Sequence, residues 1–182
     1  MIKYWCLNFD FYEKLKKKFL DYGLKNNLWL MQYQYNIQEK GSVTKNWNIV
    51  KEIQLNDFCV AYLKHSMFFA TGKAISPRKP AKHNDNVQRT ITDKTHIYND
   101  GIIHYTDSSV FYEDLTGNFF IDDWKYGQRI DIESWENVNS TGIKIKGLLD
   151  TVQEMGMTCR TAAFQISENF YYKIVSALRN GN

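Results

Sequence analysis

The spacing of apolar residues changes several times along the chain, and each change predicts an element. Residues 2–9 (IKYWCLNF) form a nearly continuous apolar run rich in strand-forming residues, which predicts a buried strand. Between residues 11 and 22 the apolar side chains recur at helical spacing with lysines opposite them, and Gly23 follows where a helix C-cap belongs. This second segment is therefore predicted as an amphipathic helix.

Four further segments have the pattern of strands. Residues 28–35 (LWLMQYQY) predict a second strand. Asp57 opens the apolar run FCVAYL, and residues 67–75 follow it after a short polar turn, which together predict a hairpin. Residues 129–135 alternate between apolar and polar positions, as a half-buried strand does.

The remaining segments carry weaker patterns. They predict loops at 36–45 and 76–86, a short helix or turn at 49–53, short strands at 96–105 and 109–115, and terminal helices within 151–156 and 164–180. The element order indicates an α+β protein with about six strands and helices at both ends. A small barrel is the natural packing for such an order.

The composition is that of a folded domain. The chain has 182 residues, of which 43% are hydrophobic and 24% charged, so it can bury a core without disulfides or metals. No apolar run reaches the length of a membrane span, and the N-terminus lacks the pattern of a signal peptide. Three cysteines lie far apart, which favours reduced thiols and a cytoplasmic location.

Aromatic content and charge distribution change this picture. Aromatic residues make up 15% of the chain, which suggests stacking surfaces; Trp5 and Trp135, each inside an apolar alternation, are expected in the core. Residues 1–94 contain 16 basic and 8 acidic side chains, whereas residues 95–150 contain 4 and 10. Two basic blocks with aromatic residues between them fit a surface that follows a phosphate backbone. The expected backbone contacts are Lys14, Lys17, Lys18, Lys73, Arg78, Lys79, Lys82 and Arg89.

Four segments, taken in order, resemble the PUA-like superfamily and, within it, the YTH and EVE domains. YWCLNF matches the first strand of that family, and NNLWLMQY matches the second, where a Trp follows an Asn–aliphatic pair. DFCVAYLKHSMFFATGKAI matches the central hairpin, and FFIDDWKYGQRIDIESW matches the last pair of strands. The family's Gly before Asp57 is Asn56 here, and the basic and polar motifs of YTH domains are only partly present.

The resemblance implies a PUA-like small β-barrel that recognises a modified base without catalysing a reaction. In YTH domains a methylated base is flipped into an aromatic cage. Carried onto this sequence, the cage walls are Trp29, Phe119 and Trp124, and Asn8 or its backbone meets the base edge. Stacking contributes about 1–3 kcal/mol per base, which offsets the few kcal/mol lost on unstacking. Trp29 and Trp124 are therefore expected to be partly exposed and to face a pocket.

The resemblance also implies a biological setting. Similar domains are the N-terminal specificity modules of McrB-type modification-dependent restriction proteins, where they precede a GTP-driven motor. By this analogy we expect DNA rather than RNA as the target, and a motor GTPase domain or a nuclease subunit as partner. Residues 1–138 would form the reader domain. Residues 139–182 would form a C-terminal helical extension that packs on the barrel or leads to another domain.

Three alternatives stay open. One is a PUA-like reader of RNA. A second is a metal-dependent nuclease in which Asp123 and Lys125, with Asp107 or Asp114 upstream, hold a divalent cation. A third is an aromatic cage for methyl-lysine or a small ligand, with Asp122 and Asp123 beside the rings. The histidines and cysteines lack zinc spacing and no phosphate-binding glycine loop is present, so we expect no metal and no cofactor.

Overall fold

The computed structural model describes residues 1–9, 16–31, 42–64, 67–77, 79–80, 111–113, 119–121, 128–159 and 161–181. Its helices are α1 (Lys16–Lys25), α2 (Ser42–Lys51), α3 (Leu148–Glu154) and α4 (Glu168–Asn180). Its strands are β1 (Tyr4–Asn8), β2 (Leu28–Met31), β3 (Phe58–Leu63), β4 (Met67–Lys73), β5 (Lys79–Pro80), β6 (Phe111–Glu113), β7 (Phe119–Ile121), β8 (Gln128–Asp131), β9 (Ile143–Lys144) and β10 (Ala163–Gln165).

The largest sheet contains five strands in the order β10-β1-β3-β4-β9. Strands β1 and β3 run parallel, with Asn8 opposite Tyr62, and the other neighbouring pairs are antiparallel. Parallel neighbours need a long crossover connection. Helix α1, strand β2 and helix α2 supply this connection between β1 and β3. The predicted hairpin of β3 and β4 is confirmed.

A second sheet, β2-β8-β5, lies beside the first, and β6 pairs with β7 separately. Two isolated bridges, Thr71 with Glu136 and Ala74 with Ile132, join strand β4 to the chain that continues from β8. The α+β class is therefore confirmed. Within the described ranges the strand ladders form open sheets, and they do not close into a continuous barrel.

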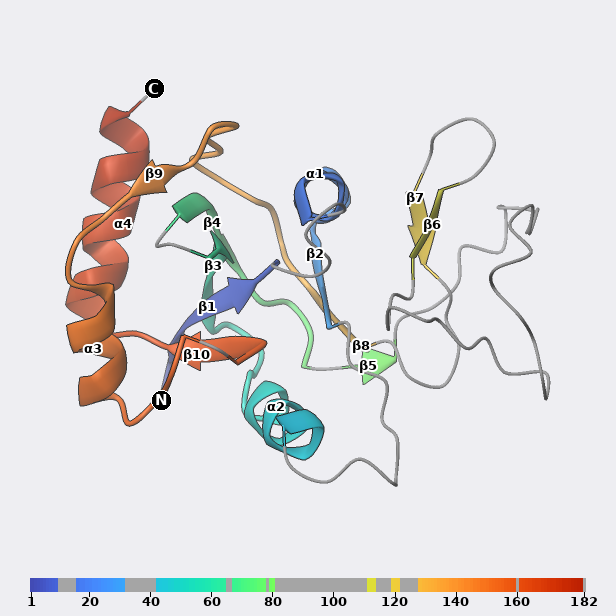
Figure 1. Cartoon of the computed structure of the whole chain (residues 1–182), viewed down its shortest axis with the longest axis horizontal. Helices are drawn as coiled ribbons and strands as arrows, with labels where there is room; N and C mark the ends of the chain where they lie inside the picture. The colour runs from blue at the N-terminus through green and yellow to red at the C-terminus, as the bar shows by residue number, and fades with distance from the viewer. Residues whose placement is uncertain are drawn as a thin grey trace.

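Apolar side chains cover both faces of the five-stranded sheet. Because side chains alternate along a strand, Trp5 and Leu7 enter one cluster while Cys6 enters the other. The first cluster also contains residues of α1, α2 and β2, and the second contains residues of α3 and α4. Figure 1 shows α3 and α4 on one side of the sheet and α1 and α2 on the other. The core positions predicted for Trp5 and Trp135 are confirmed.

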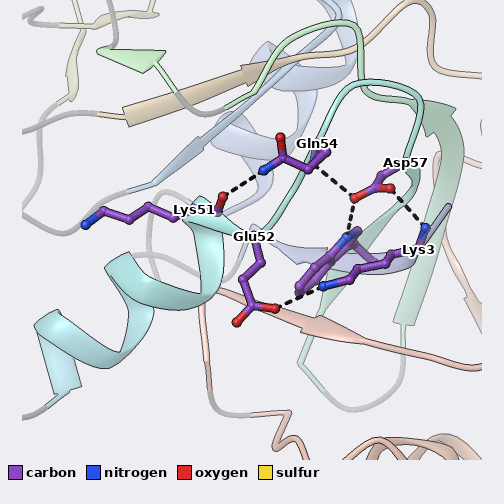
Figure 2. A network of polar contacts seen from close by, with 6 residues as sticks. Lys3, Lys51, Glu52, Gln54 and Asp57 are labelled. Atoms are coloured by element: carbon purple, nitrogen blue, oxygen red, sulfur yellow. Dashed lines mark hydrogen bonds and ion pairs between the residues drawn. The ribbon is translucent and has the colours of Figure 1, made fainter. Parts of the chain in front are cut away.

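A buried carboxylate ties the start of the chain to this core (Figure 2). The side chain of Asp57 is 2% exposed, and it accepts hydrogen bonds from the Lys3 backbone N–H (2.9 Å), the Trp5 indole N–H (2.9 Å) and the Gln54 backbone N–H (3.0 Å). Such bonds offset the cost of burying a charged group. Asp57 is therefore a structural residue at the entry to β3.

The residue before Asp57 has an uncommon backbone conformation. Asn56 has φ +73°, in the left-handed region that favours glycine. Asparagine is among the few other residues that enter this region readily. Asparagine at position 56 therefore suits the backbone turn that leads into β3.

Several predicted segments differ in the structure. Gly23 is not the C-cap of the first helix, because α1 continues to Lys25. The strand predicted over 129–135 ends at Asp131. The loop predicted over 36–45 is wrong for its last part, because α2 begins at Ser42 and buries Asn46 and Val50. The helix predicted within 164–180 begins at Glu168, because Ala163–Gln165 pair with β1 as strand β10. Residues 139–182 thus contribute β9 and β10 to the main sheet, in addition to helices.

Candidate nucleic-acid interface

The candidate interface lies where the parallel strands β1 and β3 end. Asn8 is the last residue of β1 and is partly exposed. Its backbone N–H donates to the Ala162 carbonyl at 2.9 Å, and its side-chain amide lies 3.5 Å from the Thr161 carbonyl, at the outer limit of a hydrogen bond. The carboxyl ends of neighbouring parallel strands are where open α/β sheets bind ligands. Asn8 thus lies, partly exposed, at the end of the sheet where β1 and β3 both end.

Buried polar groups hold the backbone around Asn8. The Asn46 side chain, 3% exposed, accepts a hydrogen bond from the Ala162 backbone N–H at 2.6 Å. The hydroxyl of Thr161 lies 2.6 Å from the Ala163 carbonyl and 2.9 Å from the Thr158 carbonyl. These contacts connect α2 and β10 to the end of β1. Hydrogen bonds within the protein therefore fix the backbone at this end of the sheet.

Three lysines flank the same end of the sheet, and we call them the lysine rim: Lys17, Lys64 and Lys144. Lys64 directly follows β3, and Lys144 lies opposite Met67 at the start of β4. In the strand order, β9 is three intervals from β1, which is about 14 Å at the usual strand spacing. This separation is within the reach of a short stretch of nucleic-acid backbone.

Lys17 is held in place by several contacts. Its Nζ lies 2.8 Å from an Asp21 carboxylate oxygen and donates to the Ser140 carbonyl at 3.1 Å. The same ammonium lies 5.6 Å from the centre of the Phe69 ring. Asp21 offsets part of its charge, so Lys17 contributes less positive potential to the rim than an unpaired lysine would.

The expectation that Trp29 is partly exposed is wrong. Its side chain is fully buried, in the cluster with Trp5 and Leu7. Its indole N–H donates to the Asn8 carbonyl at 3.0 Å, which satisfies the polar end of the ring inside the core. The structure thus brings Trp29 next to Asn8, but as a support beneath the end of β1 rather than as an exposed wall.

The two other aromatic residues predicted for the pocket have side chains outside the described part of the structure. The backbone of Phe119 belongs to β7, while its side chain lies outside the described part, as does all of Trp124. The carboxylates and lysine of the nuclease alternative also lie outside it: Asp107, Asp114, Asp122, Asp123 and Lys125.

The predicted backbone-contact residues do not form one described surface. Lys17 lies over the ring of Phe69, which belongs to the first core cluster, on the α1 side of the sheet. Lys73 lies on the opposite side, beside Tyr171 of α4. Lys18 and Lys79 are described only by their backbone, in α1 and β5. The remaining four lie outside the described residues: Lys14, Arg78, Lys82 and Arg89.

Sequence reasoning missed Lys64 and Lys144. Each stands alone among uncharged neighbours or beside a single further lysine, so neither belongs to a conspicuous basic block. The position of Lys64 at the turn of the predicted hairpin was a usable signal, because hairpin turns lie at the surface. The partner strand of Lys144 could not be inferred from its local sequence.

This end of the molecule presents the ammonium groups of the lysine rim and the hydrogen-bonding amide of Asn8. Burial raises the pKa of the Cys6 and Cys59 thiols, so both stay protonated and unreactive at neutral pH. In the described ranges no group of three His, Cys, Asp or Glu side chains gathers as a metal site would. None of the helices there is long and apolar enough to cross a bilayer.

Comparison with known proteins places the chain by fold. No protein-family model and no curated protein match it. A solved structure described as a hypothetical protein from Leishmania major superposes with a TM-score of 0.51 at 12% sequence identity, covering 100% of this chain and 97% of that one. At this identity the similarity concerns the fold alone.

Proposed function

We propose that the chain is a PUA-like domain that binds nucleic acid and reads a flipped, modified base without catalysing a reaction. The observation that carries this proposal is the position of Asn8, at the end of the parallel pair and flanked by the lysine rim. An amide can distinguish base edges through hydrogen bonds, and lysines neutralise phosphates.

The arrangement of the strands supports the barrel that this proposal requires. The four segments that carry the resemblance include β1, β2, β3 with β4, and β8. The bridges at Thr71 and Ala74 connect β4 toward β8, and β8 pairs with β2. The bond from the Trp29 indole to the Asn8 carbonyl then links β2 back to β1. A barrel in which the Trp29 side chain joins β2 to β1 accounts for the two bridges, for the pairing of β8 with β2 and for the indole hydrogen bond.

The burial of Trp29 revises the proposed base pocket. Asn8 supplies the polar contact, and any stacking walls come from elsewhere, with Phe119 and Trp124 as the proposed rings. Unstacking a base costs a few kcal/mol, and stacking on an aromatic ring returns about 1–3 kcal/mol. A polar contact to the base edge is then needed for discrimination. We propose DNA as the target and a motor GTPase domain or a nuclease subunit as the partner.

A binding panel tests the proposal. Fluorescence anisotropy is measured with one oligonucleotide that is unmodified, adenine-methylated, cytosine-methylated or hydroxymethylated, in single- and double-stranded forms and as RNA. We expect one modified DNA to bind most tightly. Asn8→Ala should remove most of the preference and leave the background binding in place. Equal affinity for every member of the panel would contradict the reader function.

The lysine rim is tested separately. Replacing Lys64 and Lys144 by Gln should weaken modified and unmodified targets alike, because phosphate contacts position without specifying. It should also reduce the slope of log affinity against log salt by about 1 per lysine. The control replaces Lys25 and Lys51, both exposed and outside the rim. A flat salt response of the wild type would contradict nucleic-acid binding altogether.

Incubation with magnesium or manganese tests the nuclease alternative. We expect DNA and RNA to stay intact. Reproducible cutting that disappears in Asp123→Ala and in Lys125→Ala would replace the reader function by nuclease activity.

A further inference from the structure

A small cavity lies between α4 and the sheet, on the side away from α1. Its volume is about 110 Å³, and Phe58, Gly72, Lys73, Glu133, Ser134, Glu136 and Tyr171 line it. A protein cavity of about 150 Å³ holds a benzene molecule, so this somewhat smaller cavity has room for a compact group. It can accept a compact chemical group but not a nucleotide.

Hydrogen bonds between neighbouring strands fix the walls of this cavity. Phe58 in β3 lies opposite Lys73 in β4. On the other edge of β4, the Glu133 backbone N–H donates to the Lys73 carbonyl at 2.9 Å, and Glu136 exchanges two backbone hydrogen bonds with Thr71. The main-chain positions that carry both carboxylates are therefore set by the sheet.

The lining is acidic overall. Glu133 and Glu136 outnumber Lys73, which gives a formal charge of −1. Within the described residues neither carboxylate forms an ion pair, and Lys73 forms none. A phosphate would meet two carboxylates here. Lys73 is thus poorly placed for the phosphate backbone path predicted from the sequence.

Aromatic rings form the wall on the α4 side. The Phe58 and Tyr171 ring centres are 5.2 Å apart, and Tyr4 stacks on Phe58 with centres 5.4 Å apart. Burial, with Glu136 nearby as a smaller cause, raises the pKa of Tyr171 to about 12, so its hydroxyl stays neutral at physiological pH. Rings beside carboxylates are the surroundings in which proteins hold ammonium and guanidinium groups.

We propose that this cavity binds a compact organic cation, a guanidinium or alkylammonium group. The cation contacts the Phe58 and Tyr171 rings and pairs with the carboxylates of Glu133 and Glu136. The site lies on the opposite side of the sheet from Lys17 and does not depend on base reading. The ammonium group of Lys73 repels the bound cation and lowers the affinity of the wild-type protein for it.

The test is a titration of the intact protein followed by amide chemical shifts, at constant ionic strength. The probe is N-acetylarginine amide, and N-acetylcitrulline amide is the neutral control of nearly the same shape. We expect saturable shifts at Gly72 and Tyr171 with the arginine probe alone. No saturable shift, or equal shifts with both compounds, would overturn the proposal. Comparing agmatine with a pentapeptide that contains one arginine distinguishes a free small cation from a protein side chain.

Two variants give opposite expected effects. Glu133→Gln with Glu136→Gln should weaken the arginine probe about tenfold, because two exposed charge contacts are lost. Lys73→Met should strengthen it about threefold, because a like charge is removed. Glu154→Gln, exposed at the end of α3, is the control. Unchanged affinity in the double variant, or weaker binding in Lys73→Met, would overturn the cation site even if the other variant folds poorly.

Discussion

The Trp29 side chain connects the predicted base-reading residue Asn8 to the core. The ring fills the space between β2 and β1, and its N–H satisfies the carbonyl at the end of β1. An indole in this position stabilises the fold through apolar contacts and through one partly buried hydrogen bond. It also sets the position of the backbone from which the Asn8 amide extends.

Truncating Trp29 should destabilise the protein strongly. We expect Trp29→Ala to lower the free energy of unfolding by about 3–5 kcal/mol, because it leaves a large cavity. Trp29→Phe keeps most of the apolar volume but removes the hydrogen bond that the indole N–H donates to the Asn8 carbonyl, so a loss of about 1–3 kcal/mol is expected. Chemical denaturation measures both. Tyr172→Ala, at a ring that is 52% exposed, is the control and should change little. A Trp29→Ala protein as stable as wild type would show that this ring is not a core residue.

A second prediction at this scale concerns Asp57. Asp57→Asn replaces one acceptor oxygen by an NH₂ group, which must then face a backbone or indole N–H. A buried group left without its partner costs about 1–3 kcal/mol. Urea denaturation should therefore show a loss of this size. Asp21→Asn, in an exposed ion pair, should stay within about 0.5 kcal/mol of wild type. If both variants behave alike, the Asp57 network does not stabilise the fold.

Among the elements, α4 contributes the most side chains to the core cluster on the α3 and α4 side of the five-stranded sheet. Phe170, Tyr171, Ile174 and Leu178 form its buried stripe. Its N-terminus is capped by Ser167, whose hydroxyl accepts from the Phe170 backbone N–H at 3.3 Å and lies 2.9 Å from the Thr151 hydroxyl in α3. The cap thus joins two helices. It also sets the start of the helix that carries Tyr171 to the cation cavity.

Removing this cap should weaken the helix without emptying the core. Ser167→Ala is expected to cost about 1 kcal/mol. Ser176→Ala, at an exposed position inside the same helix, should be neutral or slightly stabilising because alanine has the higher helix propensity. Thermal unfolding followed by circular dichroism compares the two. Equal melting temperatures would mean that Ser167 does not act as a cap.

At the scale of the whole molecule, the core contains two thiols that ionise only after unfolding. Burial raises the pKa of Cys6 and Cys59 in the folded state, while an unfolded thiol has a pKa of about 8.5. A group with a raised folded pKa contributes stability that is complete below its unfolded pKa and is lost as the pH rises. The protein should therefore lose stability above about pH 8.5.

The expected loss is about 1.4 kcal/mol per pH unit for each of the two thiols. Urea denaturation at several values between pH 7 and pH 10 measures it. Cys59→Ala removes one of the two contributions, so its stability should fall less steeply with pH than that of wild type. Parallel curves for the two proteins would show that Cys59 does not remain protonated in the folded state.

Several elements were predictable from the sequence because their patterns are local. A short stretch of sequence is enough to recognise each of three patterns: the apolar run of β1, the hairpin of β3 and β4, and the helical stripe of α4. In such a run the local spacing of apolar residues matches the period of the element that forms. Trp5 and Trp135 were correctly predicted in the core for this reason.

Contacts between distant segments decided the rest. The segment from Ala163 to Gln165 has a helix-compatible sequence but becomes a strand because the edge of β1 offers hydrogen bonds to it. Trp29 is buried because β8 pairs with β2 and the end of β1 contacts the indole ring.

The sequence by itself therefore determined the element types where apolar spacing is strong, together with the α+β class. Only the tertiary structure decided which face each charge occupies: it separated Lys17 from Lys73, brought Lys64 and Lys144 to the end of β1 and β3, and placed Glu133 and Glu136 beside Tyr171. Periodicity along one segment reports which side chains are buried. It carries no information about which other segment will cover them, and both proposed sites depend on that pairing.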